Sequence, residues 1–149
     1  MLIRELRPGD AVACDAIVAG LPDWFGDPTG IRDCASAVRW QPGLVAIDHA
    51  ELRGFLTWIR DAGGAEITWM AVRADRRRSG IGRALLETLV AQLRDAGVAE
   101  LRVKTLSSRH ADLGYAETRA FYDALGFEAH AELDIWGPEN PAVALRRDL

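Results

Sequence analysis

The sequence predicts one α/β domain whose central sheet mixes antiparallel and parallel strands. Three apolar runs, Leu44–Asp48, Gly54–Arg60 and Glu66–Val72, are separated only by short polar connections, which favours an antiparallel meander. After these runs the apolar residues recur every four positions, as on one face of a helix. The segment Glu100–Leu106 follows that helix, so we expect a strand parallel to the one before it, through a right-handed crossover.

The N-terminal part predicts one further strand and two helices. Residues Leu2–Leu6 alternate in polarity, and Asp10 is placed to cap a helix over Ala11–Leu21. The turn-rich segment 22–30, PDWFGDPTG, then leads into a second helix over Ile31–Trp40.

The second half predicts two helices and a closing hairpin. Ile81, Leu85, Leu89 and Leu93 define an amphipathic helix, and a glycine follows it at a helix-ending position. The predicted elements after the meander are the helix Gly80–Ala96, the strand Glu100–Leu106, a polar loop Ser107–Gly114, the helix Tyr115–Leu125, and a hairpin of Phe127–Leu133 with Val143–Arg147.

Composition limits the classes of function. The 149 residues are 49% hydrophobic, which is enough for one core. A net charge of -4 and the lack of a long basic tract argue against nucleic acid as a partner. No apolar run approaches the roughly 20 residues that span a bilayer, and no signal peptide is evident, so we expect a cytoplasmic protein without a membrane partner. Cys14 and Cys34 are far apart and the histidines do not cluster, so we expect no metal.

The stretch 73–86, RADRRRSGIGRALL, places cations where a helix begins. Because a helix N-terminus carries about half a positive charge, each of Arg76–Arg78 and Arg83 is disfavoured there by roughly 0.3 to 1 kcal/mol. A bound multiply charged anion would remove the conflict, and Gly80 and Gly82 would let the main chain approach it. The alternatives are a solvated basic loop or a nucleic-acid patch.

Two common phosphate motifs are absent from this stretch. There is no Gly-Lys-Ser/Thr for a Walker loop, and Leu85 occupies the position of the third small residue of a dinucleotide fingerprint. The pattern Arg77-x-x-Gly80-x-Gly82 instead resembles the pyrophosphate-binding motif of the GNAT superfamily of acyl-CoA-dependent N-acetyltransferases. The segment 117–127, ETRAFYDALGF, resembles the fourth-helix signature of the same family, and the order of elements agrees over essentially the whole chain.

The resemblance implies a GNAT fold: a single domain over residues 1–149, with a mixed sheet of about six to seven strands and helices on both faces. It implies acetyl-CoA as acyl donor, with the backbone of Met70, Ala71 and Val72 along the pantetheine arm and thioester carbonyl. The residues implied around the pyrophosphate are Arg77, Arg78, Ser79, Gly80, Ile81, Gly82 and Arg83.

Two side chains are candidates for proton transfer. Tyr122 matches the family tyrosine beside the departing sulfur; a thiol pKa near about 8.5 and a phenol pKa near about 10 make this protonation inexpensive. Glu66 lies where some protein-acetylating members carry a general base, and a base is useful because an alkylamine with a pKa near about 10.4 is mostly protonated. The alternative for Tyr122 is an aromatic residue that only packs at a helix end, and the alternative for Glu66 is a strand-edge glutamate that faces solvent. Tyr115 replaces an asparagine that contacts the donor in many members.

The acceptor side is predicted from two turn-rich segments. Trp24 and Phe25 lie between the first two helices, and Trp136 lies in the last hairpin, with acidic residues near each. We expect them to bind a cationic, partly apolar amine, or alternatively to hold the loops together. His110 is an alternative acid or base, and Arg109 a candidate contact to the 3'-phosphate of the donor.

The function expected from sequence is therefore transfer of acetyl to a primary amine of a small molecule or peptide. Attack is expected to be direct, in a ternary complex, because neither cysteine lies near the motifs. The alternative is a non-catalytic acyl-CoA-binding or regulatory module. A homodimer is compatible with these expectations, and the sequence leaves the oligomeric state open.

Overall fold

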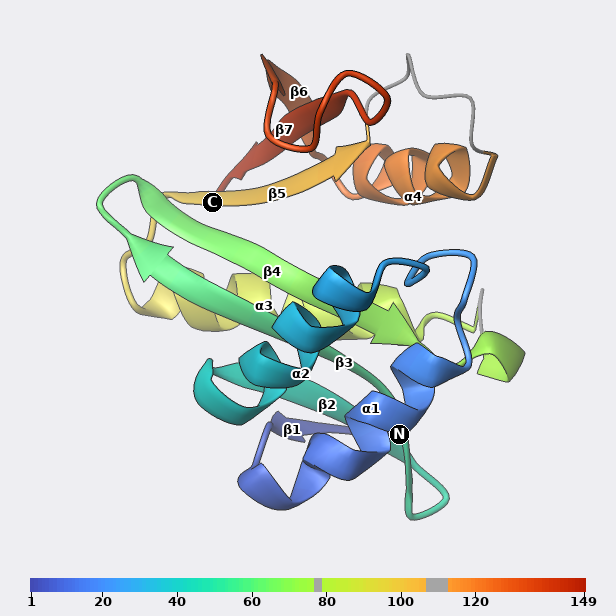
Figure 1. The fold of residues 1–149 in the computed structure, drawn as a ribbon. Helices are drawn as coiled ribbons and strands as arrows, with labels where there is room; N and C mark the ends of the chain where they lie inside the picture. The colour runs from blue at the N-terminus through green and yellow to red at the C-terminus, as the bar shows by residue number, and fades with distance from the viewer. Residues whose placement is uncertain (77–78, 107–112) are drawn as a thin grey trace.

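The computed structural model describes residues 1–76, 79–106 and 113–149, and these residues form a seven-stranded mixed sheet with helices on both faces (Figure 1). The strand order is β1-β2-β3-β4-β5-β7-β6. The strands are β1 (Leu2–Glu5), β2 (Gly43–Asp48), β3 (Glu51–Asp61), β4 (Gly64–Val72), β5 (Glu100–Leu106), β6 (Glu128–Leu133) and β7 (Ala142–Asp148). The helices are α1 (Ala11–Ala19), α2 (Pro28–Trp40), α3 (Ile81–Asp95) and α4 (Leu113–Ala124), with short 3-10 turns η1 (Pro8–Asp10) and η2 (Ala74–Arg76).

The predicted fold class is confirmed. Strands β1 to β4 form an antiparallel meander, β4 and β5 are parallel, and β5, β7 and β6 are antiparallel to their neighbours. Helices α1 and α2 lie in front of the sheet in Figure 1 and α3 lies behind it. The sequence did not predict that β7 inserts between β5 and β6.

The meander strands are longer than their apolar runs. β3 begins at Glu51 and β4 at Gly64, so each hairpin has a two-residue turn. In the first turn His49 and Ala50 both have positive φ, 50° and 62°, the left-handed region that a tight hairpin turn needs. The predicted strand began at Gly54, whereas β3 begins three residues earlier and includes Arg53, which is buried.

Helix α2 begins three residues before its predicted start. Asp27 caps it, because its carboxylate accepts a hydrogen bond from the Thr29 amide at 3.0 Å, and Pro28 occupies the first helical position. The prediction of a start at Ile31 overlooked this Asp-Pro signal.

Asp10 directly precedes α1, but its side chain makes no cap hydrogen bond to that helix. Its carboxylate instead accepts from the Arg7 amide at 2.8 Å and from both terminal nitrogens of Arg4 at 2.8 and 2.9 Å. Asp10 thus occupies the predicted N-cap position of α1, but a guanidinium and an earlier amide bind its carboxylate in place of an α1 amide. Helix α1 also ends at Ala19 rather than Leu21.

Each face of the sheet carries its own hydrophobic cluster. Behind the sheet, Leu85 and Leu89 of α3 are fully buried, as their spacing predicted. Gly54 of β3 allows close contact there: a Cβ at this position would lie 2.9 Å from Ile81 Cγ2. Glycine on β3 thus lets the first residue of α3 pack directly on the sheet.

The C-terminal part agrees with the sequence to within about two residues at the element ends. Helix α4 begins at Leu113 rather than Tyr115, and β6 and β7 form the predicted hairpin. The polar loop predicted over 107–114 falls largely on residues 107–112, which lie outside the described residues, as do Arg109 and His110.

Candidate active site

Strands β4 and β5 pair over only part of their length. The parallel pairs are Ala65 with Leu101, Glu66 with Arg102, and Ile67 with Val103. Beyond this point β4 continues to Val72 and stays paired with β3, while β5 continues to Leu106 and stays paired with β7. The two strands therefore diverge (Figure 1), and the β4 main chain from Thr68 onward has no β5 ladder partner.

A β-bulge in β4 marks the same place. Thr57 pairs with Trp69 and Trp58 with Ile67, so Thr68 is the extra residue. Its hydroxyl lies 2.7 Å from that of Thr57 and donates to Gln41 Oε1 at 2.5 Å. This polar chain holds the bulge against the end of α2.

The bulge changes which β4 side chains face each layer. Before it, Ala65 and Ile67 belong to the cluster behind the sheet, and after it Met70 and Val72 pack there. Ala71, by contrast, is buried in the cluster under α1 and α2. The predicted donor-binding residues Met70, Ala71 and Val72 thus lie on the part of β4 that β5 leaves unpaired, with their side chains in the core as the sequence indicated.

The N-terminus of α3 lies just after β4. Gly80 is its N-cap with φ of +86°, and a Cβ there would have no heavy atom within 4 Å. No side chain caps the helix, and the amides of Ile81, Gly82 and Arg83 precede the first residue that can bond within it. A helix start with uncapped amides is the kind of site that binds anions, and the predicted motif residues Gly80, Ile81, Gly82 and Arg83 lie at this helix start. Ser79 is exposed, and its hydroxyl donates to the Arg76 carbonyl.

The structure describes only Arg76 of the arginine run at residues 76–78. Arg77 and Arg78, the central members of the predicted motif, lie outside the described residues. Arg76 is half-buried, and its Nε is buried with no hydrogen-bond partner among the residues that the structure describes. A buried N–H of this kind is costly unless a ligand or another group satisfies it, which fits an anion at this loop.

Tyr122 lies in the core behind the sheet with 4% of its surface exposed. Its ring makes edge-to-face contacts with Phe121 and Phe127, with centroids 5.2 and 5.3 Å apart. Burial raises the pKa of the Tyr122 phenol well above its usual range, so the hydroxyl keeps its proton at neutral pH. Phe121 also connects this tyrosine to the helix start, because a Cβ on Gly82 would lie 3.3 Å from its ring.

Glu66 lies where β4 and β5 begin to diverge, one residue before Ile67, which forms the last β4–β5 pair. Its side chain is 15% exposed, and Oε1 lies 3.0 Å from Nζ of Lys104 on β5. Glu66 is therefore neither a freely solvated strand-edge residue nor an isolated carboxylate. The sequence reasoning did not single out Lys104; its being the only lysine of the chain was the available signal.

The predicted acceptor aromatics do not gather into one cluster. Phe25 and Trp24 are half-buried against the core under α1 and α2, and the Phe25 ring lies 5.8 Å from that of Trp69 on β4. Trp136, in the β6–β7 connection, is 44% exposed, and its neighbour Ile135 is 50% exposed. Phe25 thus links the α1–α2 connection to β4, while Trp136 presents an apolar surface to solvent.

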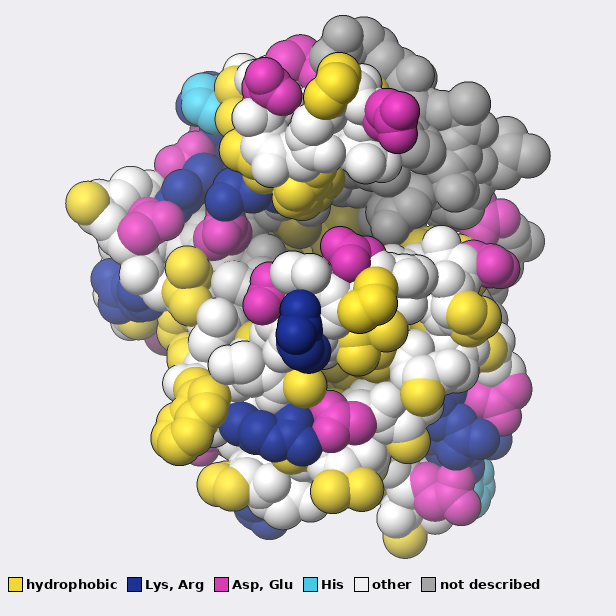
Figure 2. Space-filling view, viewed as in Figure 1, with side chains coloured by type: hydrophobic (Ala, Val, Ile, Leu, Met, Phe, Trp, Pro, Cys, Tyr) yellow, Lys and Arg dark blue, Asp and Glu magenta, His cyan; other side chains and the backbone are white. Residues whose placement is uncertain are grey.

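Figure 2 shows the surface hollowed between the part of the molecule that carries α1 and α2 and the part that carries β6 and β7. Hydrophobic side chains line the hollow, and acidic side chains are present on both sides of it. This is the level at which β4 and β5 diverge (Figure 1), so the opening in the sheet reaches the surface there.

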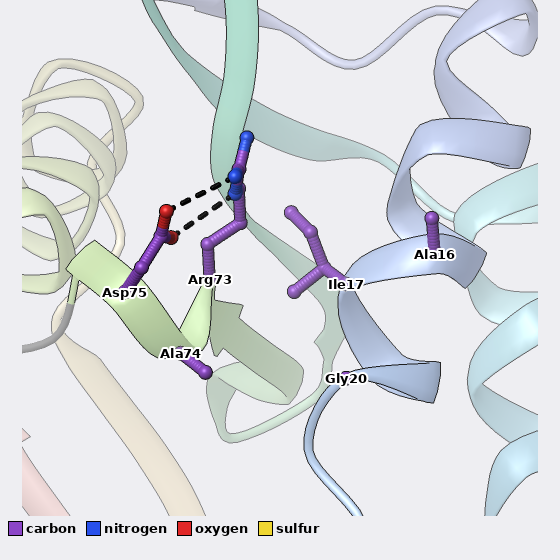
Figure 3. Close-up of a pocket in the computed structure, with 6 residues that line it drawn as sticks. All are labelled: Ala16, Ile17, Gly20, Arg73, Ala74 and Asp75. Atoms are coloured by element: carbon purple, nitrogen blue, oxygen red, sulfur yellow. Dashed lines mark hydrogen bonds and ion pairs between the residues drawn. The ribbon is translucent and has the colours of Figure 1, made fainter.

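A second hollow, of about 250 Å³, lies between the C-terminal half of α1 and η2 (Figure 3). Arg73 and Asp75 face each other across one side of it, with Arg73 Nη2 3.1 Å from the carboxylate. Ala16, Ile17 and Gly20 line the opposite side. Arg73 also binds Glu51 at 3.0 Å. Its guanidinium is thus already neutralised, which makes this hollow a poorer anion site than the α3 N-terminus.

Within ranges 1–76, 79–106 and 113–149, no three histidine, cysteine or acidic side chains gather as a metal site would require. In the same ranges no helix has the length and apolar character needed to cross a bilayer. Cys14 and Cys34 are free and buried, and burial raises the pKa of each thiol to about 12.

Comparisons with known proteins identify the family of this chain. A family model described as "Acetyltransferase (GNAT) domain" matches residues 40–129. The chain therefore belongs to the GNAT acetyltransferase family, as its motifs predicted. Among curated proteins none matches this chain in sequence.

Solved structures show the same fold. A GNAT-family acetyltransferase from Desulfovibrio desulfuricans superposes with a TM-score of 0.85 at 24% identity, covering 99% of this chain and 98% of that one. An aminoglycoside 6'-N-acetyltransferase complexed with coenzyme A gives 0.76 at 20% identity, with 99% and 97% covered. A ribosomal-protein-alanine N-acetyltransferase from Brucella melitensis gives 0.76 at 20% identity, with 100% of both chains covered.

Proposed function

We propose that this GNAT-family protein transfers an acetyl group from acetyl-CoA to a primary amine of a small molecule or peptide. The observation that carries the proposal is the divergence of β4 from β5 directly before a helix start with free amides. A thioester arm needs main-chain partners along its length, and a pyrophosphate needs N–H donors at its end. The two features follow one another along the chain, in that order.

The residues that would hold the donor fall into two groups. The first is the β4 backbone over Met70, Ala71 and Val72, which pairs with β3 but has no ladder partner on β5. The second is the loop and helix start, namely Arg77, Arg78, Ser79, Gly80, Ile81, Gly82 and Arg83. Open space above Gly80 and the unsatisfied Nε of Arg76 support binding of an anion there. When bound, acetyl-CoA would supply the activated acyl carbon.

Two side chains would move protons in this proposal. Glu66 would accept a proton from the attacking ammonium, directly or through water, because its carboxylate already binds an amine at the edge of the opening. Tyr122 would donate a hydrogen bond or proton to the departing thiolate, since its buried phenol stays protonated at neutral pH. Attack would be direct within a ternary complex, because both cysteines are buried thiols under α1 and α2.

The acceptor would enter at the hollow shown in Figure 2. Acidic side chains on both sides of it favour a cation, and the exposed ring of Trp136 offers an apolar and cation–π surface. Among relatives of the same fold, one is named for aminoglycosides and another for a ribosomal-protein alanine. Both names denote amine acceptors, and they support the class of acceptor rather than one compound.

The test measures CoA release from acetyl-CoA across a panel of amines and peptides, together with donor affinity by calorimetry. In the presence of an accepted amine, Tyr122→Phe should lower kcat by roughly a hundredfold or more, as expected for lost acid catalysis, while CoA affinity changes little. Arg77→Ala with Arg78→Ala should instead weaken CoA far more than a pantetheine fragment that lacks the pyrophosphate. Donor binding without turnover on any amine would favour the non-catalytic alternative.

A further inference from the structure

The one lysine of this chain lies beside the proposed general base. The sequence holds 18 lysine and arginine residues, and all except Lys104 are arginines. Its Nζ lies 3.0 Å from Oε1 of Glu66, and its side chain is 44% exposed. The carboxylate that we propose as the base for amine acceptors is thus already in contact with an amine of the same chain.

Three other acidic side chains around this part of the sheet bind arginines. Asp61 lies 2.5 Å from Arg102, Glu100 lies 3.8 Å from Arg146, and Glu87 of α3 lies 2.9 Å from Arg147. A guanidinium stays protonated in proteins and is a poor nucleophile, whereas a lysine amine becomes nucleophilic when it loses a proton. The Glu66–Lys104 pair therefore differs from the neighbouring ion pairs, because its cation is an amine that can become a nucleophile.

Lys104 also lies at the start of the opening in the sheet. Val103 is the last β5 residue paired with β4, and Lys104 follows it directly. Arg102 is opposite Glu66 in the parallel register, so Lys104, two residues further along β5, projects from the same face of the sheet as Glu66. The amine is therefore placed where the β4 main chain first becomes free to bind an acyl group.

We propose that Lys104 is an internal acetyl acceptor, modified by the chain's own acyl-transfer site. This inference rests on the proposed function. Glu66 takes one proton from the Lys104 ammonium, and the freed nitrogen forms a bond to the acyl carbon of the bound thioester. The carbon–sulfur bond then breaks, its electron pair leaves on sulfur as a thiolate, and that thiolate takes up a proton to give free CoA. The nitrogen loses its second proton to water as the amide forms.

Acetylation would change the site that carries it. The amide of acetylated Lys104 is uncharged and has one N–H where the ammonium had three. Glu66 would lose its ion-pair partner and become free to bind the ammonium of an external acceptor. The modified chain is therefore expected to differ from the unmodified one in acceptor affinity.

The test follows acetyl groups on the full chain by mass spectrometry after incubation with acetyl-CoA and no added amine. We expect one added acetyl group on Lys104, seen also as loss of tryptic cleavage after residue 104 while cleavage after the arginines continues. The rate constant should not change when the protein is diluted, because donor, base and acceptor share one chain. The α-amino group of Met1, at the β1 edge of the sheet, reports spontaneous acetylation in the same sample.

Two variants make the result decisive. Lys104→Arg keeps a cation beside Glu66 and should gain no acetyl group in this region. Glu66→Gln keeps the shape of the site but removes the base, and should slow modification of Lys104 roughly a hundredfold while leaving the α-amino group unaffected. Calorimetry on both variants shows whether the donor still binds.

The outcomes separate this inference from the proposed function. Acetyl-CoA binding with no acetyl on Lys104, equal labelling of Lys104 and the α-amino group, or a rate that rises with protein concentration would overturn internal transfer and leave Lys104 only a charge partner of Glu66. Absence of any acetyl-CoA binding would remove the proposed function, and this inference with it.

Discussion

The left-handed glycine at the start of α3 allows a quantitative test of the donor site. Gly80 has φ of +86°, and a Cβ added there would meet no heavy atom within 4 Å. Gly80→Ala therefore introduces backbone strain without a clash. A left-handed conformation costs an L-residue roughly 1 to 2 kcal/mol, so we expect a loss of about 1 kcal/mol in the free energy of unfolding and a fall in Tm of about 3 °C.

Gly82→Ala is the matched control, two residues further along the same helix. Gly82 does not have a positive φ, so alanine gains helix propensity of up to about 1 kcal/mol. Its Cβ would lie 3.3 Å from the Phe121 ring, a contact that offsets part of this gain because the ring must shift slightly. The net change in Tm should stay within about 2 °C.

Thermal unfolding with and without CoA measures both quantities. A methyl group at Gly80 would stand in the open space from which an anion reaches the helix amides, so CoA affinity should fall roughly tenfold, or about 1.4 kcal/mol. Unchanged stability of Gly80→Ala would refute the need for a left-handed residue. Unchanged CoA affinity would show that the donor does not approach this helix start.

Two further predictions concern stability. Thr68→Val leaves the buried Thr57 hydroxyl without its acceptor, so urea unfolding should show that the free energy of unfolding falls by about 1 to 3 kcal/mol. Thr68→Ser keeps a hydroxyl and should retain most of the stability. Equal losses in both variants would argue against the polar chain of Thr57, Thr68 and Gln41. The hydrogen bond from Arg4 lowers the pKa of Asp10 in the folded chain. The Asp10 carboxylate therefore stabilises the fold fully above its unfolded pKa of about 3.9, and this stabilisation is lost as the pH falls through its folded pKa. At pH 7 Asp10→Asn should cost about 1 to 2 kcal/mol, and the gap to the wild type should close in urea titrations below about pH 4; a gap that persists in acid would contradict this assignment.

The strand and helix order could be predicted because it depends on local patterns. The apolar runs of the meander, the four-residue spacing along α3 and the glycines around it are periodicities and turn signals that each segment carries by itself. The sequence also predicted an anion at the start of α3, since cations at a positive helix end conflict locally. The start of α2 was misplaced because the Asp27 cap was overlooked, and the hydrogen-bond partners of Asp10 were missed because they depend on a guanidinium of the preceding strand.

What only the tertiary structure decided are relations between segments that are distant in sequence. The point where β4 leaves β5, the insertion of β7 between β5 and β6, and the contact of Phe121 with Gly82 depend on register and packing, which no local pattern encodes. The pairing of Glu66 with Lys104 is the clearest case. Thirty-eight positions separate the two residues in sequence, and only the parallel register of two strands brings their side chains within 3.0 Å. The sequence by itself therefore indicated the family and predicted a donor motif, whereas the fold determined which amine lies beside the proposed base.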